Sequence, residues 1–116
     1  MKRQWAEQAG RRAEDEAASY LERQGWAVLA RRRRTPVGEI DLIARRPGLV
    51  AFVEVKWRRT AEQLALAIDE ARLARVAAAA EAVAHEYART GDDLTVDVLL
   101  LAPGTEPRHI RNAWQP

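Results

Sequence analysis

Residues 38–57 read GEIDLIARRPGLVAFVEVKW, and their pattern indicates the architecture of the middle of the chain. Apolar and polar residues alternate with a period of two on both sides of Pro47-Gly48, which is typical of two β-strands joined by a tight turn. We therefore predict strands over Glu39–Arg45 and Leu49–Trp57. Around a two-residue turn, residues equally distant from the turn lie opposite each other.

This register divides the predicted hairpin into two faces. One face is wholly apolar and is expected to lie in the core. Its opposed pairs are Ile40 with Val55, Leu42 with Val53, and Ala44 with Ala51. On the other face, Asp41 lies opposite Glu54 and Glu39 lies opposite Lys56. A shift of one residue would move the acids onto the apolar face, so the pattern itself supports this pairing.

Asp41 and Glu54 are therefore two carboxylates in direct opposition. Such a pair repels at a cost of roughly 0.2–1 kcal/mol when exposed, and more when half-buried. A divalent cation between them would remove the conflict, and carboxylate oxygens without cysteine or histidine suit Mg²⁺ or Mn²⁺. We predict a metal site at this position. The alternative is a solvated face on which Glu39 and Lys56 form a plain surface ion pair.

Lys56 stands two residues after Glu54 and so shares its face of the strand. Of the 19 basic residues in the chain, 17 are arginine, so the general bias toward arginine does not account for a lysine here. A compact ammonium group could orient a water molecule or stabilise negative charge that develops on a phosphate. Lys56 is therefore a candidate for the chemistry of the site.

Glu14 lies in a segment, Gln4–Gln24, whose apolar residues recur at spacings of three and four and predict a helix that ends at Gly25. Its helical neighbours include Ala17 and Leu21, so it lies on the apolar side. An inward-facing glutamate needs a partner. Either an arginine at the edge of the core pairs with it, or it is a third acid at the metal site.

The remaining segments complete the predicted order of elements. They are a strand over Trp26–Arg33, a turn over Thr35–Gly38, a long helix that opens with a capping box at Thr60–Gln63 and closes at Thr90-Gly91, a buried strand over Leu94–Ala102, and a last strand within Arg108–Ala113. The apolar stripe of the long helix includes Leu66, Leu73, Val76, Ala80, Val83 and Tyr87.

The first three predicted strands can pair as an antiparallel meander. The long helix then suggests a crossover that places Leu94–Ala102 parallel to the third strand. The predicted fold class is α/β, with a mixed β-sheet flanked by helices in the order α-β-β-β-α-β-(β). A length of 116 residues corresponds to a single domain over residues 1–116.

Composition excludes several classes of protein. With 47% hydrophobic and 31% charged residues, the chain is globular rather than disordered. Its apolar runs are far shorter than the roughly 20 residues of a membrane helix, and the basic start lacks the apolar run of a secretory signal, so we expect a cytoplasmic protein without a membrane partner. The absence of cysteine excludes disulfides and thiol catalysis.

Three clusters of arginine lie near the ends of the predicted strands and could hold a phosphate backbone near the metal. They are Arg31, Arg32, Arg33 and Arg34; Arg45 with Arg46; and Arg58 with Arg59. Such contacts weaken with salt and carry little sequence preference. The alternative is that each cluster is a solvated strand end.

Aromatic and histidine residues give weaker indications. Trp26 is expected in the core, whereas the position of Trp57 is open. Trp5 and Trp114 could mark a homodimer contact. The two histidines, His85 and His109, show no partner pattern and are expected on the surface.

The chain also resembles a known superfamily at these residues. An acid on one strand followed by Glu-x-Lys on the next, here Asp41 and Glu54-Val55-Lys56, is the signature of the PD-(D/E)xK nucleases. The segments GRRAEDEAASYLERQG (10–25), GEIDLIAR (38–45) and VAFVEVKWR (50–58) resemble the YraN-like family of small bacterial proteins. The resemblance implies a restriction-endonuclease-like fold, similar to that of Holliday-junction resolvases.

The resemblance also implies roles for individual residues. Asp41 and Glu54 would be metal ligands, Lys56 the catalytic lysine, and Glu14 the helix glutamate that completes the site. Glu39 belongs to the motif without an assigned role. The leading hypothesis is a Mg²⁺-dependent DNA endonuclease that hydrolyses phosphodiester bonds, with branched or damaged DNA as substrate. The alternatives are a non-catalytic nucleic-acid-binding module of a DNA repair or recombination complex, and an interaction domain whose acids only solvate the sheet.

Overall fold

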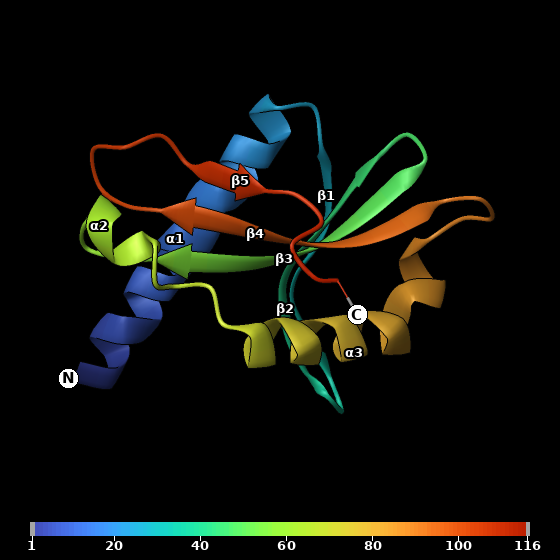
Figure 1. The fold of residues 1–116 in the computed structure, drawn as a ribbon, viewed down its shortest axis with the longest axis horizontal. Coiled ribbons are helices and arrows are strands. Elements are labelled where there is room, and N and C mark those ends of the chain that lie inside the picture. Colours follow the sequence, from blue (N-terminus) through green and yellow to red (C-terminus); the bar gives the residue numbers. More distant parts are fainter. Residues whose placement is uncertain (1, 116) are drawn as a thin grey trace.

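Five strands form one mixed sheet whose spatial order, β1-β2-β3-β4-β5, follows the chain (Figure 1). The computed structural model describes the backbone of residues 2–115 and the side chains of residues 10–115. The elements are α1 (Lys2–Arg23), β1 (Ala27–Thr35), β2 (Gly38–Arg46), β3 (Leu49–Trp57), α2 (Ala61–Leu64), α3 (Glu70–Tyr87), β4 (Asp93–Leu101) and β5 (Arg108–Ile110). The first three strands are antiparallel, β4 is parallel to β3, and β5 is antiparallel to β4. The predicted meander, crossover and mixed sheet are confirmed.

Helices cover both faces of the sheet, and each face has its own apolar core (Figure 1). On the α1 side, Ala17, Ala18 and Leu21 pack against Leu42 and Val53 and are fully buried. On the α3 side, the buried residues of the helix are Leu73, Val76, Ala79, Ala80 and Val83, and they pack against strand residues that include Ile43 and Phe52. The sheet is therefore the middle of three layers. None of the described helices has the length and apolar character needed to cross a membrane.

The register of the β2–β3 hairpin is the predicted one from Leu42 opposite Val53 to Arg46 opposite Leu49. Gly48 supports the turn with a φ of 77°, a conformation that favours glycine. Beyond Leu42 the regular pairing ends, and there the side chain of Asp41 accepts a hydrogen bond from the backbone N–H of Val55.

The prediction that Ile40 lies on the same face of the sheet as Leu42 and Val55 is wrong. Ile40 belongs to the α3-side core, whereas Leu42 and Val55 pack on the α1 side. Ile40 and Val55 therefore do not form a pair on one face. The strict alternation fails where the two strands cease to pair, because no ladder then fixes successive side chains to opposite faces.

The predicted start of the long helix is also wrong. Thr60 makes no side-chain cap, and the helix that follows it ends at Leu64. A second helix, α3, begins after Asp69, whose carboxylate accepts hydrogen bonds from the backbone N–H groups of Ala71 and Arg72. Leu66 lies in the break between the helices and is 90% exposed, so it is not part of the buried stripe.

The C-terminal strand is held by a buried carboxylate. Asp97 is completely buried in β4, and its oxygens accept hydrogen bonds from the backbone N–H of Asn112 at 2.9 Å and meet Nε2 of His109 at 2.7 Å. The expectation that His109 is a surface residue without a partner is therefore wrong, because this pair anchors β5 to β4. His85 is exposed and Trp26 is buried, as expected.

Candidate metal centre

Asp41 lies where β2 and β3 cease to pair. It is half-buried, and its Oδ2 accepts a hydrogen bond from the Val55 backbone N–H at 2.8 Å. This bond orients the carboxylate across the gap between the strands. The loss of the ladder beyond Leu42 leaves the Val55 N–H without a strand partner, and the Asp41 side chain satisfies it.

The charge state of Asp41 is strongly perturbed. Burial, followed by a hydrogen bond with the neighbouring Glu54 carboxyl and the charge of that carboxyl, raises the pKa of Asp41 to about 8. The Val55 N–H opposes this shift, and the charge of Glu14 adds to it. Asp41 and Glu54 are thus close neighbours, as predicted. Burial and the neighbouring acids thus disfavour the ionised form of Asp41, and a bound cation would favour it.

Three carboxylates around Asp41 have the geometry of a cation site. Glu14 from α1, and Glu39 and Asp41 from β2, each offer one oxygen, and these oxygens lie within 4.8 Å of one another. All three residues are half-buried. Hard oxygen donors of this kind suit Mg²⁺ or Mn²⁺. The raised pKa of Asp41 means that its ionised form is disfavoured, and a bound cation would stabilise that form. The residues present therefore fit such an ion.

Glu39 was not predicted as a ligand. The sequence assigned it to the motif without a chemical role and expected it to face Lys56. In the structure, Glu39 instead lies 3.6 Å from the Arg34 guanidinium and joins the oxygen cluster. Its position two residues before Asp41, on the same strand, was the signal that could have identified it.

Glu54 faces α3. Its side chain is 4% exposed, and its Oε2 accepts a hydrogen bond from Nε of Arg72 at 2.7 Å. Glu54 lies beside Asp41, but it is not among the three residues whose oxygens converge. Sequence reasoning missed Arg72 altogether, since no local pattern relates the first turn of α3 to a residue 18 positions earlier.

Glu14 pairs with an arginine, which was one of the two alternatives that the sequence left open. Its side chain is 13% exposed and pairs with Nε of Arg32, and it is also one of the three converging acids. Arg32 lies in β1 with a φ of 50°, which is unusual for a residue other than glycine. Its bond with Glu14 raises the pKa of the Arg32 guanidinium above its usual value.

Lys56 lies at the end of β3, two residues after Glu54, and is half-buried. Among the side chains of residues 10–115 it forms no ion pair, so the alternative of a surface ion pair between Glu39 and Lys56 is not seen there. The next residue, Trp57, is 40% exposed.

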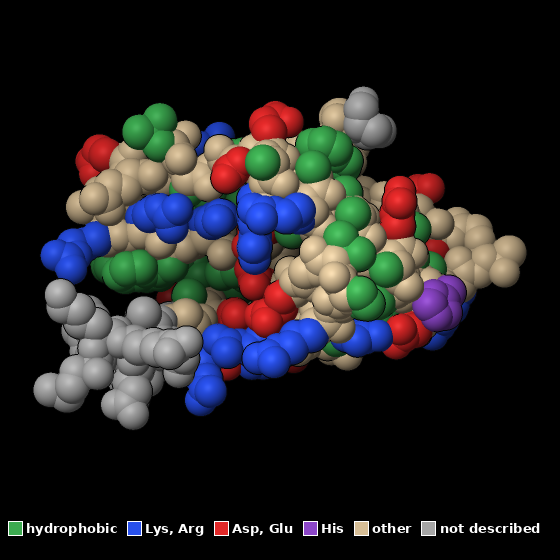
Figure 2. All heavy atoms as spheres, turned by 90° about the horizontal axis from the view of Figure 1, so that it is seen from below, with side chains coloured by type: hydrophobic (Ala, Val, Ile, Leu, Met, Phe, Trp, Pro, Cys, Tyr) green, Lys and Arg blue, Asp and Glu red, His purple; other side chains and the backbone are tan. Residues whose placement is uncertain are grey.

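The predicted arginine clusters differ in how their charge is used. Five of these arginines pair with acids: Arg31 with Asp15, Arg32 with Glu14, Arg33 with Glu86, Arg34 with Glu39, and Arg45 with Asp92. Within the described side chains, Arg58 and Arg59 have no carboxylate partner. Figure 2 shows one face on which two rows of basic side chains flank a group of acidic side chains.

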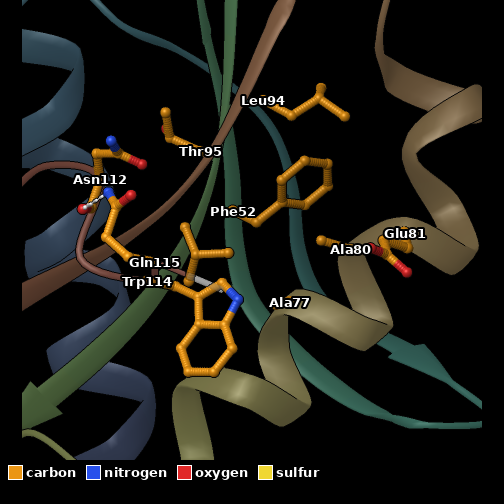
Figure 3. Close-up of a pocket in the computed structure, with 10 residues that line it drawn as sticks. Phe52, Ala77, Ala80, Glu81, Leu94, Thr95, Asn112, Trp114 and Gln115 are labelled. Atoms are coloured by element: carbon orange, nitrogen blue, oxygen red, sulfur yellow. Dashed lines mark hydrogen bonds between the residues drawn. The ribbon is translucent and has the colours of Figure 1, made fainter. Parts of the chain in front are cut away.

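A cavity of about 310 Å³ lies apart from the acids, between β4, α3 and the C-terminal segment (Figure 3). Phe52, Ala77 and Trp114 give it a largely apolar lining, and Glu81 is its one carboxylate. Trp114, considered above as a homodimer contact, packs against the α3-side core. The side chain of Trp5 lies outside the described residues. This cavity does not contribute to the acidic cluster.

Comparison with known proteins identifies the family. The model of an uncharacterised family, UPF0102, matches residues 13–101, which include every acid of the cluster. A UPF0102 protein of Erythrobacter litoralis is 64% identical over 116 residues, the whole of both chains. A second, from Sphingopyxis alaskensis, is 56% identical, again over the whole of both chains. A third, from Rhizorhabdus wittichii, is 49% identical over 94% of this chain and 92% of its own. The chain belongs to the uncharacterised protein family UPF0102.

Proposed function

We propose that this protein is a Mg²⁺- or Mn²⁺-dependent nuclease with a restriction-endonuclease-like fold. The observation that carries the proposal is the convergence of carboxylate oxygens from Glu14, Glu39 and Asp41 beside the buried Glu54. The signature of an acid and Glu-x-Lys, formed by Asp41, Glu54 and Lys56, supports the same assignment.

Each residue would have a distinct task in phosphodiester hydrolysis. Glu14, Glu39 and Asp41 would hold the ion, and Glu54 would set the charge and position of Asp41. A bound divalent ion would polarise the phosphate and favour deprotonation of the attacking water. Lys56, half-buried and free of an ion pair among residues 10–115, would donate a hydrogen bond to the phosphate as its negative charge increases.

The proposed substrate is DNA, with branched or damaged DNA suggested by the resemblance to resolvases. Two rows of basic side chains flank a group of acidic side chains on one face of the molecule, and this arrangement supports an anionic polymer as ligand (Figure 2). Arg58 and Arg59 follow Lys56 by two and three residues, so they are well placed to contact the same backbone.

A cleavage assay tests the proposal. Labelled linear, single-stranded and four-way-junction DNA would be incubated with the protein in Mg²⁺ or Mn²⁺, in EDTA, and with Asp41→Ala. We expect cutting that requires the metal and disappears in the variant. Asp93→Ala, at an exposed position at the start of β4, is the matched control and should cut normally.

One observation favours a second candidate, a nucleic-acid-binding module without turnover. Arg72 pairs with Glu54, Arg32 with Glu14 and Arg34 with Glu39, so three of the four acids already have a cationic partner. Salt-sensitive binding of DNA that is unchanged in Asp41→Ala, with no cutting of any substrate, would support the module and contradict the nuclease. A protein that binds neither metal nor DNA would instead be an interaction domain.

A further inference from the structure

Two arginines from different elements hold two acids of the cluster. Arg72, from α3, binds Glu54 at 2.7 Å, and Arg32, from β1, binds Glu14. Both guanidiniums also lie within electrostatic reach of Asp41 and of Glu39. The arginines and the acids therefore form one charge network rather than two isolated ion pairs.

The members of this network differ in their access to solvent. The side chains of Glu54 and Glu14 are 4% and 13% exposed, whereas those of Arg72 and Arg32 are 35% and 38% exposed. An anion arriving from solution can therefore reach the guanidiniums without first uncovering the acids. Guanidinium groups also match the geometry of phosphate, which they bind through two parallel hydrogen bonds.

The same network opposes a metal ion in the free protein. Arg32 holds an oxygen of Glu14, which is one of the converging carboxylates, and Arg72 holds an oxygen of the neighbouring Glu54. A divalent cation placed among these acids would be repelled by the positive charges of both guanidiniums. A phosphate that drew the guanidiniums away would remove this repulsion and release the carboxylate oxygens. Phosphate and metal ion would then each favour the binding of the other.

We propose that Arg72 and Arg32 are substrate-phosphate ligands that are held by Glu54 and Glu14 in the free protein, so that nucleic acid and metal ion bind cooperatively. This inference rests on the proposed function and adds two substrate contacts to it. The arginines exchange a carboxylate for a backbone phosphate, and no covalent step is involved. If the ion pairs were purely structural, the affinity for the metal ion would not change when nucleic acid binds.

The test measures this coupling directly. The affinity of the full chain for Mn²⁺ would be determined by calorimetry and by electron paramagnetic resonance, with and without a short DNA duplex at fixed low salt. The affinity for the duplex would be determined with and without Mn²⁺, and a gel would confirm that the DNA remains intact. We expect each ligand to tighten the other by the same factor, roughly 5- to 150-fold, as linkage requires.

Variants separate the arginine exchange from general electrostatics. Arg72→Gln should reduce the coupling factor toward one and should not weaken the binding of Mn²⁺ in the absence of DNA. Arg75→Gln is the matched control, because Arg75 is exposed, lies one turn along α3, and has no ion pair among the side chains of residues 10–115. It should leave the coupling factor unchanged.

If Arg72→Gln fails to fold, as judged by circular dichroism, Arg72→Lys retains the charge that Glu54 needs but not the bidentate geometry, and it should also lower the coupling. Equal Mn²⁺ affinity with and without DNA in the wild type would overturn the inference and leave the metal site intact. Equal loss of coupling in Arg72→Gln and Arg75→Gln would overturn it as well. No Mn²⁺ binding in either state would overturn the proposed function itself.

Discussion

Asp41 imposes a pH-dependent cost on the folded state. Its pKa is about 8 in the folded protein and near 3.8 in an unfolded chain. Below that lower value both states are protonated and the cost is absent. As the pH rises from 4 to 8 the unfolded chain releases the proton while the folded protein retains it, so the free energy of unfolding falls; above pH 8 the loss is complete. A metal ion bound by ionised Asp41 would compensate for this loss.

Replacing this carboxyl should therefore stabilise the metal-free protein. We expect Asp41→Asn to raise the free energy of unfolding in EDTA by about 1–3 kcal/mol at pH 8, because an amide needs no cation and still accepts the Val55 hydrogen bond. The gain should be smaller at pH 5. Urea unfolding at both pH values measures the effect, and Asp15→Asn, at an exposed position, is the control. A gain that is equal at both pH values would contradict the assigned shift.

Single residues of the candidate site could be predicted only in part. Alternation placed Asp41 and Glu54 on one face of the hairpin, and helical spacing placed Glu14 on the inner side of α1. The partners Arg72 and Arg32 could not be predicted, because they approach from other elements and their contacts depend on how those elements pack. The convergence of Glu39 with Asp41 arises where the strands separate, which alternation does not indicate.

At the level of elements, the β2–β3 hairpin was predictable and the start of α3 was not. A strand pattern and a Pro-Gly turn fix the register locally. The segment after Thr60 has a helix-start pattern, but Leu64 and Ala67 pack into the α3-side core and the helix is interrupted between Leu64 and Glu70. Tertiary packing thus overrides the local signal, and Asp69 becomes the effective cap.

Removing the two candidate caps distinguishes the observed helix start from the predicted one. Asp69→Ala should lower the free energy of unfolding by about 0.5–2 kcal/mol, because two backbone N–H groups lose their acceptor. Thr60→Ala should change it by less than about 0.5 kcal/mol, since Thr60 makes no capping bond. Urea unfolding of both variants measures the difference. A larger loss in Thr60→Ala would show that the capping box is the one in use.

Across the whole molecule, a net charge of +2 conceals how the positive charge is distributed. The run from Arg31 to Arg34 resembles a phosphate-binding patch in the sequence, yet each of its members faces a carboxylate in the structure. Those acids come from α1, α3 and β2, so the sequence alone could not predict that they pair with arginines of β1. The arginines without a described carboxylate partner, such as Arg58 and Arg59, are therefore the better candidates for constant contact with DNA.

The salt dependence of DNA binding tests this distribution. Arg58→Gln and Arg59→Gln should each weaken binding and reduce the slope of log affinity against log salt by about one, because each removes one phosphate contact. Arg45→Gln should leave the slope unchanged, since Asp92 takes both Nη1 and Nη2 of Arg45 at 2.7 and 3.1 Å. Fluorescence anisotropy over a series of salt concentrations measures all three slopes. If Arg45→Gln lowers the slope as much as Arg58→Gln does, then the pair with Asp92 does not keep Arg45 from the nucleic acid.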